Sequence, residues 1–265
     1  KENIRQNLRA CQLRQLEILK EIDRICQKHH IEYWLDGGSL LGAVRHQGFI
    51  PWDDDIDICM YRKDYERFLD IFSEKRSSDR FDAVNYRNGK GVYPFTKIVD
   101  TTTVVYENFV RKDIAVGVWV DVFPIDEIDP GNSDLFRRRN RANLWYSFIL
   151  ADPNVGSSPW VKLAKKIVCP LVRGLDPKKY ARTIDEVAQE TEPGSTGLVS
   201  EFVGEGKPAY TFPRNFYEPV ELPFAGRTYF GPREYERILE TIYGDWRTPP
   251  AEGNRNIHTF EAFQL

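Results

Sequence analysis

An alternation of acidic and apolar side chains over residues 53–60 constrains the fold of this chain more than any other feature. Side chains two residues apart on a strand lie on the same face. The pattern therefore predicts a strand over residues 55–60, with Asp55 and Asp57 on one face and Ile56 and Ile58 in a core. Neighbouring carboxylates resist joint ionisation unless a cation lies between them, and hard oxygen ligands suit Mg²⁺ or Mn²⁺. Asp55 and Asp57 are thus candidate metal ligands.

Two other interpretations of the acidic stretch remain. A solvated acidic turn would not need the alternating isoleucines. A calcium loop of the EF-hand type would need glycine where Ile58 stands and a helix on each side. We therefore favour a metal-binding strand.

A third acidic residue lies within an apolar segment. Residues 116–123 predict a strand whose valines share one face, while Asp121 shares the other face with Trp119. An aspartate inside so apolar a strand is costly unless it is paired or metal-bound. We expect Asp121 to complete the metal site; a salt bridge to Arg or Lys is the alternative.

Gly37-Gly38-Ser39 precedes the acidic strand and stands where a short helix is predicted to begin. Two glycines and a hydroxyl at a helix start offer N–H groups to a phosphate. Alone the tripeptide is most often an ordinary turn. The order strand, Gly-Gly-Ser, helix and Asp-x-Asp strand would bring a phosphate-binding turn beside a metal site.

The remaining periodicities predict a mixture of elements without strict βαβ alternation. Helices are expected over 4–30, 62–75, most of 133–190 and 232–243, and strands over 31–35, 81–86, 93–99, 102–107 and 116–123. The chain past Gly194 is rich in Pro and Gly and reads as irregular. This pattern predicts an α+β fold with a mixed sheet flanked by helices.

The bulk properties exclude several classes of protein. The 265 residues carry a net charge of −3, which gives no electrostatic reason to bind nucleic acid. The four cysteines lack zinc-site spacing and suit a reducing compartment. The chain has no apolar run of the ~18 residues needed to span a bilayer and no apolar stretch of a signal peptide at its start. We expect a cytoplasmic protein.

Residues 160–175 predict a helix with an apolar stripe bordered by basic side chains and kinked at Pro170. The stripe comprises Trp160, Leu163, Ala164, Ile167, Val168, Leu171 and Leu175, and its basic neighbours are Lys162, Lys165, Lys166 and Arg173. We expect peripheral contact of this helix with an anionic membrane, at the inner face of the plasma membrane. A helix packed in the core with its lysines in water is the alternative.

Three blocks of sequence carry a resemblance to known proteins. They are Gly37-Gly38-Ser39-Leu40-Leu41-Gly42-Ala43-Val44-Arg45-His46-Gln47-Gly48-Phe49-Ile50-Pro51-Trp52-Asp53-Asp54-Asp55-Ile56-Asp57-Ile58, then Trp119-Val120-Asp121-Val122-Phe123-Pro124, and then Tyr243-Gly244-Asp245-Trp246 with Pro249-Pro250, Arg255 and His258. Together these blocks resemble the LicD family of the nucleotidyltransferase-like superfamily, which also includes fukutin-type enzymes. The resemblance is strong over 30–125 and moderate over 228–260. Ser39 stands where the family often has Thr, which keeps the hydroxyl.

The resemblance implies a single catalytic domain with a nucleotidyltransferase-like core at 30–130, a helical basic insertion at 131–193 and a C-terminal part at 194–265. It also implies transfer of phosphocholine from CDP-choline to a sugar hydroxyl of a bacterial surface glycan, with release of CMP. The acceptor would be a lipid-linked precursor of teichoic acid or lipopolysaccharide. A different donor (CDP-ribitol, CDP-glycerol or an NTP) and a non-catalytic glycan-binding descendant are the alternatives.

Within that mechanism each candidate residue has an expected role. Asp55, Asp57 and Asp121 would hold Mg²⁺ at the donor diphosphate, and Asp121 or His258 would accept the proton of the attacking hydroxyl. The other candidates would bind substrate. Phosphate would meet Gly37, Gly38, Ser39, Arg45, Lys97 and Arg255, and the quaternary ammonium of choline would meet Trp52 and Trp119 through cation–π attraction.

Overall fold

The computed structural model of the protein describes residues 8–156, 158–251 and 260–265. Its helices are α1 (Leu8–His29), α2 (Gly37–His46), α3 (Arg62–Lys75), α4 (Ser133–Leu150), α5 (Pro159–Val172), α6 (Pro177–Ala188) and α7 (Tyr235–Tyr243). Its strands are β1 (Trp34–Leu35), β2 (Asp57–Tyr61), β3 (Phe81–Val84), β4 (Thr96–Glu107), β5 (Val116–Glu127), β6 (Leu198–Ser200), β7 (Phe212–Pro213), β8 (Pro219–Phe224), β9 (Arg227–Pro232) and β10 (Phe260–Gln264).

The main sheet is mixed. Its order is β1-β2-β5-β4-β10, with β3 paired to β4 and with β6 and β7 continuing from the end of β5. β2 and β5 run parallel, and the other described pairs are antiparallel. The predicted α+β class with a mixed sheet is confirmed. The parallel pair has the largest consequence for function, because it aligns the two acidic strands.

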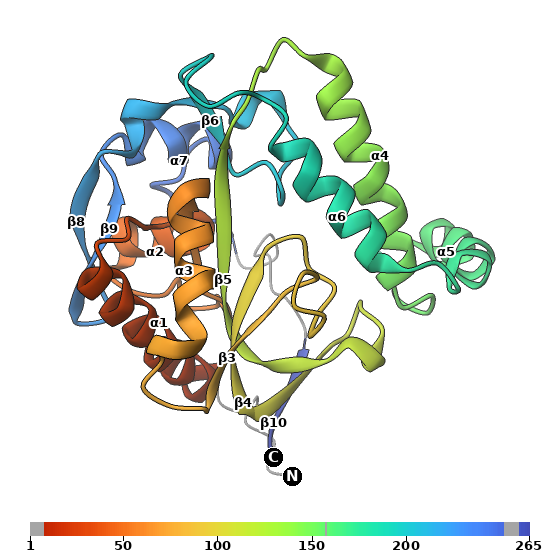
Figure 1. Ribbon diagram of the computed structural model, residues 1–265. Coiled ribbons are helices and arrows are strands. Elements are labelled where there is room, and N and C mark those ends of the chain that lie inside the picture. Colours follow the sequence, from red (N-terminus) through yellow and green to blue (C-terminus); the bar gives the residue numbers. More distant parts are fainter. Residues whose placement is uncertain (1–7, 157, 252–259) are drawn as a thin grey trace.

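Helices cover both sides of the long strand β5 (Figure 1), with α1, α2 and α3 on one side and α4 and α6 on the other. The predicted apolar stripe of α1 is buried in the core, with Leu16, Leu19, Ile22 and Cys26 each at most 5% exposed. α4 and α6 enclose a separate apolar cluster that includes Phe136, Ile184 and Phe202. In the part of the chain that the structure describes, no helix is both long enough and apolar enough to cross a bilayer.

Three elements differ from the sequence prediction. β2 begins at Asp57, so Asp55 lies just before the strand, although Asp121 N–H still bonds to the Ile56 carbonyl at 2.9 Å. The strands expected over 93–99 and 102–107 form one strand, β4, with a shift of register between Asp100 and Val105. The irregular C-terminal region contains the β8–β9 hairpin.

The β8–β9 hairpin has the backbone of a tight two-residue turn. Ala225 and Gly226 both have positive φ, at 50° and 80°, as the favoured hairpin turns require. Prolines in both strands conceal the strand pattern, because proline is rare in strands except at edges and ends. The hairpin packs Leu222, Phe224 and Tyr229 into the main core.

A buried carboxylate ties the end of β5 to the loop before β6. Glu127 accepts backbone hydrogen bonds from Gly194, Thr196 and Gly197 at 2.7, 2.6 and 2.8 Å. Burial alone would raise its pKa, but these N–H donors lower the pKa of Glu127 to about 2.

Replacing Glu127 with glutamine should therefore lower stability at neutral pH by about 1–3 kcal/mol, because buried donors lose their charged acceptor. A depressed carboxylate pKa contributes stability above the unfolded pKa of about 4.5 and loses it as the pH falls toward about 2. Urea unfolding should show the gap between Glu127→Gln and wild type closing over that range. The exposed Glu192→Gln should show no gap, and a pH-independent cost for Glu127→Gln would contradict the assignment.

Candidate active site

The carboxylates of the two acidic segments converge at one end of the parallel strand pair. Asp57 on β2 is the register partner of Asp121 on β5. Gln12 and Gln15 of α1 hold the segment before β2, since their side-chain amides donate to the carbonyls of Asp53 and Asp54 at 3.0 and 2.6 Å. The acidic stretch is thus fixed from both the sheet and the first helix.

Asp57 lies at the centre of the negative charge. Burial first, and then the carboxylates of Asp55, Asp121, Asp36 and Asp53, raise the pKa of Asp57 well above its ordinary value. Burial also raises the pKa of Asp121 despite a neighbouring lysine, and the charge of Asp55 adds to that rise. The charge of Asp55 therefore acts on both Asp57 and Asp121.

Asp121 has a basic partner. Lys97 faces it across β4 and β5 and donates to both of its carboxylate oxygens, at 2.9 and 3.0 Å. The Trp119 indole N–H donates to the same carboxylate at 3.0 Å. The Lys97 ammonium also lies over the rings of Trp119, Tyr93 and Phe95, at 4.0, 4.9 and 5.5 Å from the centroids. The cation over the ring of Trp119 is therefore Lys97.

The first turn of α2 faces the acidic residues. The helix begins at Gly37 itself, so the Gly-Gly-Ser tripeptide supplies its first N–H groups. A Cβ on Gly37 would lie 3.3 Å from an Asp57 oxygen, and a Cβ on Gly38 would lie 2.8 Å from an Asp53 oxygen, so a larger residue would make these aspartate side chains shift. The positive φ of Gly37, +49°, independently favours glycine at that position. Ser39 is buried, and its hydroxyl accepts the Asp57 backbone N–H at 2.9 Å. Ser39 thus fixes β2 against α2.

Two cavities adjoin Asp57, and Gly38, Asp57 and Tyr243 line both. The smaller, which we call the Trp52 cavity, has a volume of about 390 Å³ and is also lined by Arg45, Asp53 and Asp55. Arg45 donates to the Trp246 carbonyl at 2.7 Å, which holds its side chain in the wall. Arg255 and His258 lie outside the described residues.

The larger cavity, which we call the Glu201 cavity, has a volume of about 510 Å³ and combines acidic and aromatic side chains. Its acidic lining is Asp36, Asp57, Glu201 and Glu205, and its aromatic lining is Phe95, Phe123, Tyr210, Phe212, Tyr217 and Tyr243. Burial first, then the Asp36 carboxylate, raise the pKa of Glu201 well above its ordinary value. Such a lining suits a cation with an apolar surface.

Most of this second lining was not among the residues predicted from sequence. Asp36 directly precedes Gly37, and Tyr243 opens the C-terminal block, so both lay next to recognised motifs. Glu201 and Tyr217 come from the Pro- and Gly-rich region, where no periodicity marked them. The pairing of β6 with β5 and β7 helps to bring that region to the site.

The acidic residues fit a divalent cation. Oxygens of Asp53, Asp54 and Asp55 lie within 4.8 Å of one another. The charges of Asp53 and Asp55 also help to raise the pKa of Asp57. A donor set made only of carboxylate oxygens suits Mg²⁺ or Mn²⁺. Of the predicted ligands Asp55, Asp57 and Asp121, this group contains Asp55 alone, and its other two members are Asp53 and Asp54.

Comparison with known proteins agrees with this arrangement. Residues 30–142 match the family model described as LicD/FKTN/FKRP, nucleotidyltransferase domain. The chain is 29% identical to the lipopolysaccharide cholinephosphotransferase LicD of Haemophilus influenzae, over 97% of this chain and 98% of the relative. A segment of 55 residues is 46% identical to the human ribitol 5-phosphate transferase FKRP and covers 20% of this chain and 11% of that one.

Proposed function

We infer that this chain, which belongs to the LicD family, transfers phosphocholine from CDP-choline to a sugar hydroxyl of a bacterial surface glycan and releases CMP. The general class of activity, without a specified donor or acceptor, is that of a LicD-family transferase of substituted phosphate groups. The acceptor would be a lipid-linked precursor of teichoic acid or lipopolysaccharide. We also propose one catalytic domain, with its core at 30–130, its helical insertion at 131–193 and its C-terminal part at 194–265.

The Glu201 cavity supports choline as the transferred substituent. It adjoins Asp57 and presents carboxylates and six aromatic rings to one space. A quaternary ammonium gains from ring faces by about 0.5–2 kcal/mol and from nearby carboxylates as well. Ribitol and glycerol are neutral polyols that gain little from ring faces and need hydrogen-bond partners instead. Trp119 is the weaker candidate for this contact, because the Lys97 ammonium lies over its ring.

Asp55, Asp57 and Asp121 would hold Mg²⁺, with Asp53 and Asp54 adjacent. When bound, the metal would neutralise charge on the donor diphosphate and on the departing CMP. Mn²⁺ would suit the same oxygens. The N–H groups at the start of α2 would bind phosphate oxygens, and Arg45 would add positive charge from the Trp52 cavity.

In the transfer, the bond between phosphorus and the CMP oxygen breaks and a bond from the acceptor hydroxyl to phosphorus forms. The hydroxyl proton passes to a base, for which Asp121 and His258 are the candidates. The oxygens of Asp121 already accept three hydrogen bonds, and an ionised carboxylate has about four acceptor positions. Asp121 can therefore bind metal or accept the proton, but not both at once.

We place the reaction in the cytoplasm. Cys11, Cys26, Cys59 and Cys169 are all buried free thiols, which fits a reducing compartment.

The deciding experiment measures nucleotide release from a panel of donors. Purified protein with Mg²⁺ is incubated with CDP-choline, CDP-ribitol, CDP-glycerol or CTP, with and without EDTA and a glycan acceptor. We expect CMP from CDP-choline alone, dependent on acceptor and abolished by EDTA. Preference for CDP-ribitol would overturn the choline assignment while keeping the transferase. No release from any donor would favour a non-catalytic glycan-binding descendant.

Glu201→Gln should raise KM for CDP-choline by about 10-fold and leave kcat nearly unchanged, because a cation-binding group away from the reacting phosphorus is lost. Steady-state kinetics with CDP-choline measure this directly. Glu190→Gln, an exposed change in the segment after α6 that removes a partner of Arg138, serves as the matched control. An unchanged KM in Glu201→Gln would remove the Glu201 cavity from choline binding.

A further inference from the structure

The helix α5 leaves an apolar row exposed to solvent. Trp160, Leu163, Ile167 and Leu171 are 79%, 49%, 60% and 79% exposed. Their spacing of three and four residues places them on one face of the helix. Cys169 and Val172 are the buried residues of α5. The helix therefore packs on the protein by a different face and presents its most apolar row outward.

Basic side chains border this apolar row. Lys162, Lys166 and Arg173 are exposed and recur at four and seven residues, which places them in one row beside the apolar face. Residues 159–175 contain no acidic side chain. Lys165 is held back by a 2.8 Å hydrogen bond to the Val155 carbonyl. Two copies of this face would bring like charges together, so the charge pattern favours an anionic partner over a second copy.

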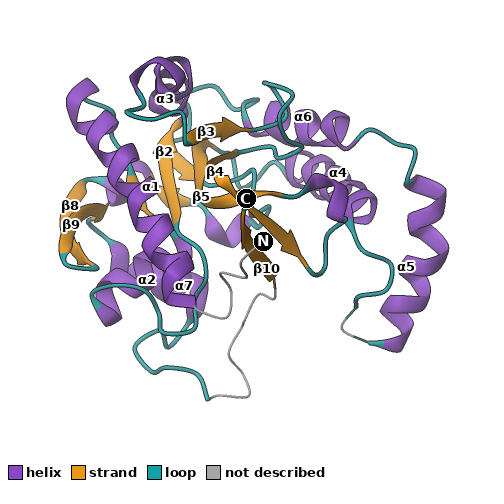
Figure 2. Cartoon of the chain, turned by 90° about the horizontal axis from the view of Figure 1, so that it is seen from below, coloured by secondary structure: helices purple, strands orange, loops and turns teal. Residues whose placement is uncertain are grey.

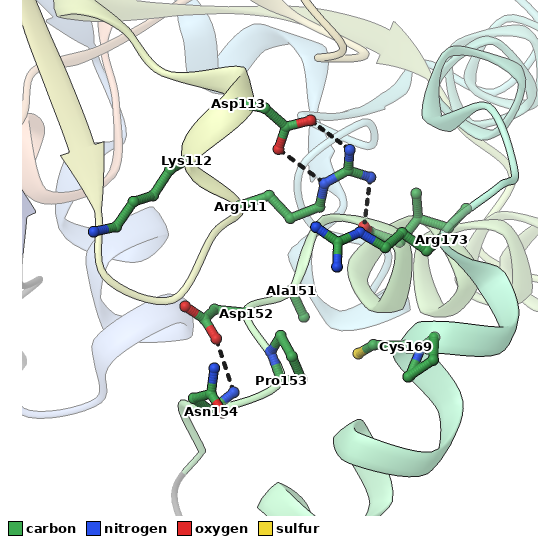
Figure 3. Close-up of a pocket in the computed structure, with 11 residues that line it drawn as sticks. Arg111, Lys112, Asp113, Ala151, Asp152, Pro153, Asn154, Cys169 and Arg173 are labelled. Carbon is green, nitrogen blue, oxygen red and sulfur yellow. Dashed lines mark hydrogen bonds and ion pairs between the residues drawn. The ribbon is translucent and has the colours of Figure 1, made fainter.

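A cavity at the C-terminal half of α5 adds further positive charge. Figure 3 shows Arg111, Lys112 and Arg173 around it, with Cys169 of α5 in its wall. Pro170 of α5 also lines it. Its volume is about 620 Å³, and it has three cations for the two carboxylates of Asp113 and Asp152. Asp113 is paired with Arg111 at 2.5 Å. The basic border of α5 thus continues onto the loop between β4 and β5.

We propose that α5 lies in the interface of an anionic lipid bilayer, with its apolar row among the acyl chains and its basic row among the head groups. Helices that lie in the membrane plane combine an apolar face with a polar face rich in Lys and Arg. Each basic residue near an anionic surface adds to the binding. Figures 1 and 2 both place α5 at the outer edge of the molecule, where a flat surface can reach it.

Co-sedimentation of the full chain with vesicles tests this interface. Vesicles of phosphatidylcholine alone are compared with vesicles that also contain phosphatidylserine. We expect binding to the anionic vesicles, weaker binding as salt rises, and little binding to the neutral ones. Lys162→Glu/Lys166→Glu should weaken binding by at least about 10-fold, and Ile167→Ser/Leu171→Ser should do so by a similar factor.

Matched controls are Lys20→Glu and Leu13→Ser on α1, which change an exposed lysine and an exposed apolar side chain away from α5. Thermal unfolding should be unchanged in all variants, since each altered side chain is exposed. Binding that survives both α5 double variants, or no binding to any vesicle, would overturn the proposal. A concentration-dependent dimer that Ile167→Ser/Leu171→Ser abolishes would assign the face to a second copy instead. The assay of CMP release is independent of vesicle binding, so failure of the membrane proposal would leave the proposed transferase activity standing.

Discussion

Asp57→Asn is expected to lower the rate of transfer by about 10³-fold or more and to raise the thermal stability of the metal-free protein. The loss follows because metal stabilisation of a transferring phosphate contributes several kcal/mol, and Asp57 lies at the centre of the acidic cluster. The gain follows because Asp57 is surrounded by the carboxylates of Asp55, Asp121, Asp36 and Asp53. Asparagine keeps the shape of the side chain and removes the repelling charge.

The opposite signs make the prediction specific. Activity is measured as CMP release at saturating Mg²⁺, and stability as thermal unfolding with and without Mg²⁺. Wild type should gain stability on adding Mg²⁺, and Asp57→Asn should lose most of that gain. Asp70→Asn, an exposed change on α3, should match wild type in every measurement. Normal turnover by Asp57→Asn would show that this carboxylate holds no essential metal.

The acidic half of the site could be predicted from sequence because strand alternation is a local property. The alternation from Asp55 to Ile58 predicts which side chains are buried, and Ile56 and Ile58 are fully buried in the structure. The same reasoning placed Asp121 on the face opposite Val120 and Val122. Convergence of the two strands needed only that they be neighbours, and the parallel register of β2 and β5 aligns Asp57 with Asp121.

The rest of the site depends on which strands pair, and no local pattern reports that. Lys97 was expected to bind the substrate phosphate. In the structure it is the direct partner of Asp121 on the neighbouring strand, and its ammonium lies over the ring of Trp119. Local sequence cannot reveal this cross-strand neighbour, because the register of β4 against β5 sets it. The Glu201 cavity was missed for the same reason, since long-range pairing carries its lining to the site.

The amphipathic pattern of residues 160–175 left one alternative open, because an apolar stripe predicts burial without saying against what. In the structure, most of the large apolar side chains of that stripe face solvent. Leu171 is exposed while Val172, one position on, is buried. Packing, rather than the stripe itself, decides which face of the helix meets the protein.

Lys97→Met is expected to lower the free energy of unfolding by about 3–5 kcal/mol, because breaking a buried ion pair leaves an uncompensated charge. Lys97 is 4% exposed, and its ammonium pairs with Asp121 and lies over three aromatic rings. Although burial lowers it, the Asp121 carboxylate raises the pKa of Lys97 above its ordinary value. Methionine fills similar space, so the cost measures the lost charge and not a cavity.

A double-mutant cycle with Asp121→Asn separates this pair from general damage. The double variant Lys97→Met/Asp121→Asn should be more stable than Lys97→Met alone, because the orphaned carboxylate is gone. Urea unfolding of the four proteins without metal gives the coupling energy. Lys162→Met on the exposed face of α5 should cost almost nothing, since it breaks no buried pair. If Lys97→Met lowered the free energy of unfolding equally with Asp121 present or replaced, the ion pair would contribute no coupling energy. Lys97 would then stabilise the fold through its ring contacts instead.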